Sequence, residues 1–583
     1  MKRIFGVAVV GLILVSLTAC SNQSGTVSGS KITIGFEDPI SSINTDLQDS
    51  VSTMSASADL ANLTTASFYS IDTAGNLSAN VDFGSVEVTS QKPFTVKYLL
   101  TGKATWSDGT KVSATDLLLS WAAASGFGGY DFKSSRDENG FRYVTEQPAI
   151  GDDGLSLTVT FNQATADYKT ALTVPVAAHA LAKITFASEK LGAKEASAKT
   201  LEAITAPKRG DLSALAKAYR NAFRLTKSTL KNPDLFVSAG PYVVTEASSN
   251  GLTLKVNPDN VWMPKGRCET LNVVFYDDAL SAVSALKAGA IDFARLEPTS
   301  TNSYSSLISA IKASKNLSSS VVASNQVETV LFNQTSQSSF SSAAFGEPGS
   351  ESADNAALEA RRAFLGIISV SKIRTLISAN QTIQDANSLV FSPESPYYQA
   401  STQDSSITGY QFADAQKSYN ALQKLGLRVP VRVLFDTANP RAQTEYSVFA
   451  DLASQVGFSL SNVSTANISD ALKVGDYDVY LAPQRLLADQ GVSLQKGFYF
   501  SKGFPSNSNL IKLMTDYGRA TTAVAQAAVL KKLDSELISQ AYALPLYQLP
   551  TIFASSKKFA KTPVSADGLS LTAGYADWNL SSK

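Results

Sequence analysis

The chain has 583 residues, which is too long for one hydrophobic core and predicts a division into two or three lobes. Its 50 lysine and arginine residues balance 50 aspartate and glutamate residues, so no excess charge would attract nucleic acid or an anionic membrane. A single histidine, His179, and two cysteines, Cys20 and Cys268, argue against a Ser-His-Asp triad, a multi-histidine metal site and a disulfide framework. We therefore expect no metal, no cofactor and no nucleic-acid partner.

The first twenty residues, "MKRIFGVAVVGLILVSLTAC", have the features of an export signal. Lys2 and Arg3 precede an apolar run that is too short for a membrane-spanning helix. The segment "LTAC" resembles a bacterial lipobox, in which the cysteine, here Cys20, receives a lipid. The alternative is an ordinary signal peptide with an incidental cysteine. We expect an extracytoplasmic protein, anchored to the cell membrane through Cys20 and the flexible tether "SNQSGTVSGS".

The first folded part, up to about residue 172, is predicted to be rich in β-strands. Apolar and polar residues alternate in "KITIGF" (31–36), "FTVKYLL" (94–100) and "SLTVTF" (156–161). Between the last two lies "ATWSDGTKVSATDLLLSW" (104–121), where Asp108 and Gly109 form a turn. Ser113 and Asp116 are spaced as a variant capping box that begins a helix, and we expect Trp106 to pack under the turn.

Helical spacing of Ala, Lys and Leu then predicts helices between 181 and 232, followed by a hairpin at 240–258. The segment 278–296 predicts a helix, a stop at Gly289 and a strand. A Ser/Asn-rich region at 299–326 predicts a helix and a strand with polar faces, and 336–356 predicts a long exposed loop. Alternating strands and helices from 357 to 460 predict an α/β lobe.

Several separated motifs resemble one protein family, the family 5 extracellular solute-binding proteins of ABC importers, which includes oligopeptide- and dipeptide-binding proteins. The strongest is the "W-S-D-G" pattern, in which Lys111 stands where the family usually has proline and Ser113 where it usually has threonine. The other motifs occur in the family's order: "VPVAAHAL", "SAGPYVV", "KVNPDNVW", "ALKAGAIDF", "ETVLFNQT", "ARRAFLGII", "DYDVYL" and "ALPLYQLP". Together they cover residues 31–560. His179 falls on a structural position of this pattern.

The resemblance implies a two-lobe α/β fold of the periplasmic-binding-protein type (class II, cluster C), with an inserted β-rich subdomain and a hinged ligand cleft. The implied boundaries are a lipoprotein signal peptide at 1–20, a tether at 21–30, lobe I at 31–65, the β-rich subdomain at 66–172, lobe I at 173–275, lobe III at 276–507 and lobe I at 508–583. A ligand would be enclosed as the lobes close about the hinge.

The same resemblance implies residues that would hold the ligand. Family members that bind peptides place an aspartate against the ligand's ammonium group, and Asp489 in "LLADQG" is the nearest equivalent. Two extra residues precede it, and the usual aromatic residue and proline are missing. Arg485 could pair with a ligand carboxylate. Further candidates are Glu37 and Asp38 after the first strand, and the aromatic residues Tyr410, Tyr477 and Tyr499 as cleft walls.

These features favour a monomeric binding protein that captures a solute, with a peptide as the first expectation, and delivers it to ABC permease and ATPase subunits. One alternative is a lipoprotein of the same fold that binds a non-peptide solute or acts in signalling. A remote alternative is an exported hydrolase, for which the sequence has no G-x-S-x-G, no H-E-x-x-H and no phosphate loop. Cys268 is expected to be a buried spectator rather than a reactive thiol, because no histidine or partner cysteine lies near it in sequence.

Overall fold

The computed structural model describes residues 25–580 apart from 38, 48–55, 72–76, 130–131, 133–140, 145, 167, 207–208, 267, 297, 299–302, 379–383, 394, 396, 403–408, 427, 487–506, 560–569 and 579. The predicted signal peptide, Cys20, Asp38, Asp489 and Tyr499 lie outside these residues. Within the described residues, no helix combines the length and apolar character that crossing a bilayer requires.

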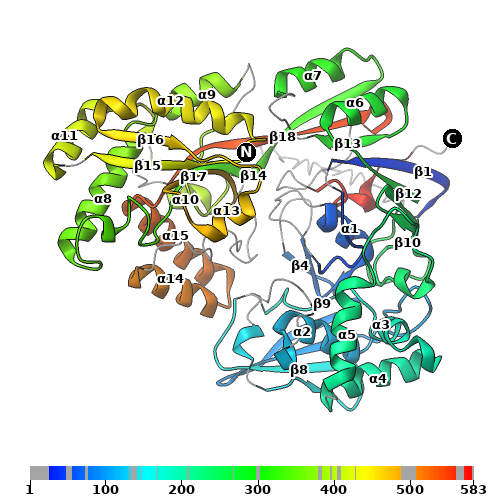
Figure 1. Ribbon diagram of the computed structural model, residues 1–583. Helices are drawn as coiled ribbons and strands as arrows, with labels where there is room; N and C mark the ends of the chain where they lie inside the picture. Colours follow the sequence, from blue (N-terminus) through cyan, green and yellow to red (C-terminus); the bar gives the residue numbers. More distant parts are fainter. Residues whose placement is uncertain are drawn as a thin grey trace, which may run out of the picture.

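The described chain contains one sheet of ten strands, in the order β10-β11-β12-β1-β13-β18-β14-β17-β15-β16. In that order the strands are Tyr242–Ser248, Gly251–Val256, Cys268–Phe275, Val27–Phe36, Phe293–Leu296, Ala543–Ser556, Leu317–Phe332, Val479–Arg485, Val429–Leu434 and Phe458–Asn462. The long strands β14 and β18 pair with each other in antiparallel orientation and join the two halves of the molecule (Figure 1). The sheet is therefore shared by both halves.

One half contains the first core, built from residues 32–275, Phe293 and the returning residues 553–578. Its helices are α1 (Ala56–Thr64), α2 (Ala114–Ser125), α3 (Ala178–Thr185), α4 (Ala193–Thr205) and α5 (Arg209–Asn221). A separate sheet has the order β5 (Gly84–Gln91), β6 (Phe94–Leu100), β8 (Ser156–Phe161) and β7 (Ala149–Ile150). Two short ladders, β2 (Ala66–Ser67) with β9 (Thr173–Val174) and β3 (Tyr69–Ile71) with β4 (Leu77–Ala79), complete this part. The predicted β-rich character of the early chain is confirmed.

The helices α6 (Ala279–Ala288) and α7 (Tyr304–Lys312) form a small core of their own beside β13 and β18. The ends of α6 follow the rules of helix capping. Asp278 accepts a hydrogen bond from Ser281 N at 2.9 Å, and Gly289 ends the helix with φ +71°, which glycine adopts without strain. The predicted helix, glycine stop and strand over 278–296 are confirmed.

The other half contains the second core, built from residues 330–549. Its helices are α8 (Glu351–Leu365), α9 (Val370–Ser378), α10 (Tyr398–Thr402), α11 (Ala415–Leu425), α12 (Pro440–Val456) and α13 (Ile468–Val474). The strands β15, β16 and β17 run parallel to one another, with α12 connecting β15 to β16. This arrangement is the α/β lobe that the alternation of strand and helix patterns predicts.

The final helices, α14 (Ser508–Arg519) and α15 (Ala523–Ser539), pack on the second half. Leu510, Leu513 and Leu533 share an apolar cluster with Leu331 of β14 and with residues 389–391. Within the sequence prediction these helices belong to a segment that begins at 508 and returns to lobe I. The chain returns to the first core along β18, and the last residues of this strand pair with β13.

Two predicted features differ from the structure. The prediction of an exposed loop at 336–356 is partly wrong. Phe340 is fully buried against Phe332 and Phe364, and α8 begins at Glu351. Ser350 caps that helix by accepting from Ala353 N at 3.4 Å. In addition, β1 begins at Val27, inside the predicted tether, because Val27 pairs with Cys268 of β12.

Candidate functional site

The two long strands change register where they pass from one core to the other. Ala323 pairs with Pro550, but the next pair is Val327 with Gln548, so three residues of β14 lie opposite one residue of β18. We call residues 324–328 and 547–550 the crossing region. A bulge of this kind loosens the ladder and turns side chains out of the regular alternation. The irregularity lies where both strands leave one core and enter the other.

The bulge is held by side-chain hydrogen bonds rather than by the ladder. The Ser324 hydroxyl donates to Leu549 O at 2.6 Å, and the Gln548 side chain donates to Ser324 O at 2.7 Å. Asn325 donates from Nδ2 to the carbonyl oxygen of Leu486, the residue that follows β17, at 2.9 Å. The crossing region is thus a buried polar patch at the junction of β14, β17 and β18.

On β14, three polar atoms of this patch have no hydrogen-bond partner among the described residues: Asn325 Oδ1, Gln326 Nε2 and Glu328 Oε1. Their side chains are at most 5% exposed. A buried donor or acceptor without a partner costs about 1–3 kcal/mol, so native proteins retain such atoms where a water or a bound molecule supplies the partner. The patch is therefore a place where an ordered water or a bound molecule would supply the missing partners.

Charged residues of α12 lie next to this patch. Arg441 Nε donates to Glu328 Oε2 at 3.1 Å, and the Tyr547 hydroxyl donates to Glu445 Oε1 at 2.5 Å. Burial, and then the nearby Glu328 charge, raise the pKa of Glu445 well above its ordinary value. Burial disfavours the charge of Arg441, but the Glu328 carboxylate outweighs it and raises the Arg441 pKa. Burial also raises the pKa of Glu328, but Arg441 beside it favours the carboxylate, so the geometry favours an Arg441–Glu328 ion pair next to a neutral Glu445.

Metal binding has no support in the described part of the chain, where no group of three or more His, Cys, Asp or Glu side chains could hold an ion. A small cavity lined by Phe36, Leu60, Leu63 and Val273 lies in the first core. Its polar neighbour Asp59 already accepts from Ser570 Oγ at 2.6 Å and Thr572 N at 2.9 Å. This cavity suits neither a metal nor a polar solute.

The site residues expected from sequence are only partly within the described chain. Arg485 is the last residue of β17, and its backbone lies opposite Gln326 in the crossing region. Glu37 is half-buried and follows β1, whose Gly35 pairs with Ala294 of β13. Asp38, Asp489 and Tyr499 lie outside the described residues. Tyr410 and Tyr477 pack around the second half, where Tyr477 contacts Tyr480 edge-on.

The "W-S-D-G" segment has a structural role. Trp106 is fully buried, as expected, and Gly109 occupies the turn with φ +85°. Asp108 Oδ2 lies 2.8 Å from Nε2 of the buried His179. Although burial opposes it, hydrogen bonds from Thr110 and His179 lower the pKa of Asp108. The turn is thus fastened to α3, and the structural reading of His179 is confirmed.

The predicted capping box is confirmed for its Asp116 half. The Asp116 carboxylate accepts from Ser113 N at 2.8 Å and from the Ser113 hydroxyl at 3.1 Å. Its other oxygen accepts from Ala178 N at 2.8 Å, which links the start of α2 to α3. The expectation for Cys268 also holds: the side chain is fully buried, and burial raises the thiol pKa to about 11. Such a thiol is unreactive at neutral pH.

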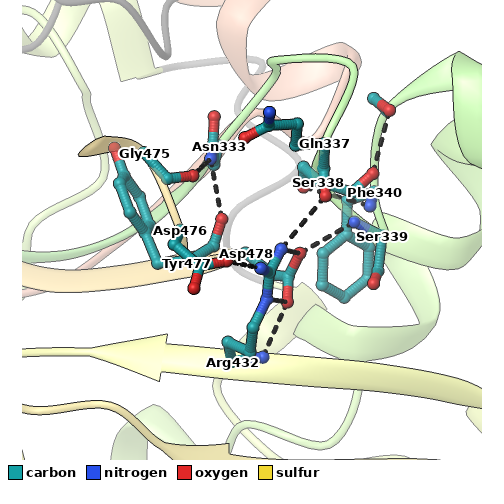
Figure 2. A network of polar contacts seen from close by, with 11 residues as sticks. Asn333, Gln337, Ser338, Ser339, Phe340, Arg432, Gly475, Asp476, Tyr477 and Asp478 are labelled. Atoms are coloured by element: carbon teal, nitrogen blue, oxygen red, sulfur yellow. Dashed lines mark hydrogen bonds and ion pairs between the residues drawn. The ribbon is translucent and has the colours of Figure 1, made fainter. Parts of the chain in front are cut away.

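The "DYDVYL" motif is structural as well. Figure 2 shows Arg432 of β15 lying against Asp478, with Nε donating to Oδ2 and NH2 to Oδ1, both at 2.9 Å. Ser339 N donates to Asp478 Oδ1 at 2.8 Å, and Asn333 Nδ2 donates to Tyr477 O at 2.7 Å. The buried Asp478 therefore joins β15, the start of β17 and the segment that follows β14.

Sequence reasoning missed the polar residues of the crossing region and their charged neighbours on α12: Asn325, Gln326, Glu328, Tyr547 and Gln548, with Arg441 and Glu445. A signal was present, because "ASNQVET" places several polar residues within a strand that is otherwise apolar. A strand buried on both faces has no place for such residues unless they meet partners or a ligand.

Comparison with known proteins agrees with this architecture. Residues 85–526 match the family model of bacterial extracellular solute-binding proteins, family 5. An uncharacterized lipoprotein of Mycobacterium leprae is 24% identical over 500 residues, which cover 82% of this chain and 80% of the relative. An uncharacterized lipoprotein of Mycobacterium tuberculosis is 33% identical over 134 residues, and this match spans 23% of that relative's length.

Two solved structures show the same fold. The periplasmic EDTA-binding protein EppA superposes with a TM-score of 0.71 at 17% identity, covering 96% of this chain and 98% of EppA. The oligopeptide-binding protein AppA of Bacillus subtilis, solved with a nonapeptide, gives a TM-score of 0.66 at 13% identity, covering 94% of this chain and 99% of AppA. The predicted two-lobe α/β fold is confirmed, and the chain belongs to the family 5 bacterial extracellular solute-binding proteins.

Proposed function

We propose that the protein is a membrane-anchored receptor that encloses a small solute, with a peptide as the first candidate, between its two lobes and delivers it to an ABC importer. The observation that carries the proposal is the family match over residues 85–526. Capture of this kind is binding without chemistry, so it needs no nucleophile and no cofactor. The permease and the ATPase subunits would be its partners.

The crossing region supports the solute-binding part of the proposal. Asn325, Gln326 and Glu328 offer an acceptor, a donor and an acceptor that no described residue satisfies. A solute with amide or carboxylate groups has complementary donors and acceptors. Because these atoms are already buried, a solute would satisfy them without further desolvation of the protein, which favours binding. Arg485, at the end of β17 beside Gln326, would be a further contact of such a solute.

The remaining site assignments are part of this proposal. We place Glu37 and Asp38 at the border of the ligand cleft, and Asp489 with Tyr499 on the segment that follows β17. We also propose that the second lobe extends through α15, since α14 and α15 pack on Leu331 of β14. The chain then returns to the first lobe within β18, in place of the boundary at residue 508.

A non-peptide solute is the second candidate. The structural neighbours include EppA, which binds EDTA, and a protein NikA from Staphylococcus aureus in complex with Ni(L-His)2, besides the peptide-bound AppA. What these ligands share is the presence of several carboxylate or amide groups. Receptors with this fold therefore accommodate both peptides and small polycarboxylates.

Lipid attachment at Cys20 is the proposed anchor. It is supported by the "LTAC" sequence after a short apolar run and by the names of the mycobacterial relatives, which are called lipoproteins. Mass spectrometry of the N-terminal peptide from the membrane fraction tests it. The proposal expects a diacylglycerol adduct on Cys20 and a loss of membrane association in Cys20→Ser.

A thermal-shift screen separates the two solute classes. The unfolding temperature would be measured with a pool of peptides of two to nine residues and, separately, with a pool of small polycarboxylates and metal chelates. A solute present at 100 times its Kd adds about 2.7 kcal/mol to the unfolding free energy, which for a chain of this length is a shift of about 2 °C. A shift with the peptide pool alone supports the peptide proposal, and a shift with the second pool alone rejects it in favour of the alternative.

A further inference from the structure

A second connection joins the two halves at a distance from the crossing strands. The short segment 162–166 follows β8 in the first half, whereas α14 and α15 pack on the second half. In Figure 1, β8 lies at the bottom of one half, α14 lies at the lower edge of the other half, and β18 runs across the top. Contacts between these elements therefore link the halves on the side opposite the crossing strands.

Gln526 makes the central contact of this connection. Its side-chain nitrogen donates to Ala166 O at 3.2 Å and to Ala520 O at 3.0 Å. The first bond joins residues that are 360 positions apart in the chain, and the second fixes the side chain on the turn between α14 and α15. Gln526 is 6% exposed, although it lies in the helix sequence "AVAQAAVLKKL". A glutamine side chain that is buried at a lobe boundary is expected to form hydrogen bonds with specific partners.

Apolar packing surrounds this hydrogen bond. Ala166 is 7% exposed and belongs to the cluster formed by Leu510, Leu513 and Tyr517 of α14 and Leu530 of α15. At the edge of the contact, Arg519 lies 3.4 Å from the side-chain oxygen of Gln163. The segment inserts a small side chain into a pocket of larger ones and satisfies its own carbonyl group there.

From this geometry we propose that Gln163–Ala166 and the α14–α15 pair form a clasp that stabilises the closed arrangement of the two lobes. The proposal rests on solute capture by lobe closure as its biological role. Because the strands β14 and β18 stay connected, opening must separate the lobes at the clasp. Gln526 is then a positioning residue that sets the ratio of open to closed molecules and, through it, the rate at which a captured solute leaves.

Single-molecule fluorescence energy transfer tests the clasp without any solute. Val81, which precedes β5, and Val474, at the end of α13, are 73% and 65% exposed and lie on opposite halves. Both would be replaced by cysteine for dye attachment in a full chain that also carries Cys20→Ser. Cys268 is fully buried and would not compete for the dyes. The distribution of dye distances then reports open and closed populations.

Gln526→Ala removes the hydrogen bond, and Ala166→Asp forces a charge into the apolar cluster. We expect Gln526→Ala to raise the open-to-closed ratio about fivefold, as the loss of one buried hydrogen bond would do, and Ala166→Asp to raise it further. Gln423→Ala, an exposed glutamine on α11, is the matched control and should leave the ratio unchanged.

Unchanged distance distributions in both clasp variants would overturn the proposal. This holds even if the unfolding temperatures of the variants fall, because a contact that is only structural lowers stability without changing the distance between the lobes. A parent molecule that is open throughout would overturn it as well. Circular dichroism establishes that each variant is folded. Failure of the solute screen would reject the proposed function. The energy-transfer measurement would still test the clasp, since no solute takes part in it.

Discussion

At Asp108, one carboxylate serves two partners and shows how a sequence signature can be structural. It accepts from Thr110 N at 3.0 Å within its own turn and lies 2.8 Å from the His179 ring on α3. Asp478 plays a comparable part in the second half, where it holds Arg432. Both signatures join elements that are distant in the chain, and neither lies in the crossing region.

Asp108→Asn should lower the unfolding free energy by about 1–2 kcal/mol at pH 7, because the replacement keeps the shape but loses the charge-assisted hydrogen bonds. The folded-state pKa of Asp108 lies below its ordinary 3.8. Its contribution is therefore complete above about pH 4 and disappears as the pH falls through the folded-state pKa. Urea unfolding from pH 7 to pH 3 should show the difference between parent and variant shrinking at the acid end.

Asp152→Asn, at an exposed position in a turn, serves as the control and should match the parent at each pH. A difference between parent and Asp108→Asn that stays constant down to pH 3 would contradict the assigned role of the Asp108 charge.

Gln326→Met should separate stability from binding. The methionine keeps a similar volume and removes a buried donor that has no described partner, so the unfolding free energy should stay level or rise by about 1 kcal/mol. Solute affinity should fall about tenfold, the effect of one lost hydrogen bond to a polar ligand. Calorimetry with a solute from the thermal-shift screen, with Gln423→Met as control, measures both. A destabilised variant with unchanged affinity would show that Gln326 is structural.

At this scale the sequence could predict residue chemistry but not residue partners. The Asp108–Gly109 turn and the burial of Trp106 follow from local pattern, and both are present. The contact of Asp108 with His179 joins residues 71 positions apart, which no local pattern encodes. The resemblance identified His179 as structural, but its partner required the fold.

Among the elements, β14, β18 and α12 carry the arrangement that distinguishes the crossing region. Strand β14 supplies Glu328, β18 supplies Tyr547, and α12 supplies Arg441 and Glu445 one helical turn apart. Since Tyr304 of α7 donates to Pro550 O at 2.6 Å, the first half also contacts the crossing region. The ionic cluster thus lies beside the register shift, where bending of the strands would change the distances between its charged groups.

Glu328→Gln and Glu445→Gln should lower the unfolding free energy by very different amounts at pH 7. Glu328→Gln leaves the buried Arg441 without its anionic partner, which costs about 3–5 kcal/mol. Glu445→Gln replaces a protonated acid by a neutral amide of the same shape, so the change should stay within about 1 kcal/mol. Chemical denaturation of the two variants checks this pair. A larger loss in Glu445→Gln than in Glu328→Gln would reverse the assignment of charge.

The same variants have a pH signature. The folded-state pKa of Glu445 lies well above its ordinary 4.5, so the parent should lose stability as the pH rises above about 4.5 towards that pKa. Glu445→Gln has no proton to lose there, and its stability should lack this downward slope. A parent and a variant with parallel pH profiles would show that Glu445 is ionised in the folded state.

The sequence predicted regular elements well and irregular ones poorly. Alternation identified β6, whose side chains alternate between buried and partly buried along its length, and the Gly289 stop identified the end of α6. The prediction of an exposed loop at 336–356 is partly wrong. Ser and Gly in this segment are typical of loops, but Phe340 within it is buried in the second core. The register shift between Ala323 and Val327 depends on the pairing of two strands that are more than 200 residues apart in sequence.

For the whole molecule, the two connections define what can move. The crossing strands join the halves at one side, and Gln526 with Ala166 joins them at the other. A solute held between these connections would be released only when the clasp separates. The lobe architecture was predictable because the family motifs occur in order along the chain and each describes a piece of the scaffold. The proposed ligand contacts were not, because they lie on β14 and at the end of β17, which only the fold brings together.

Native mass spectrometry of the parent and of Gln326→Met, both purified without refolding, tests the central claim most directly. We predict that the parent carries a non-covalent small molecule, which is lost under collisional activation, and that Gln326→Met carries markedly less of it. The mass of the released molecule identifies the solute class. A parent that has its bare mass under all conditions, and that gives no thermal shift with either solute pool, would contradict solute capture in the crossing region.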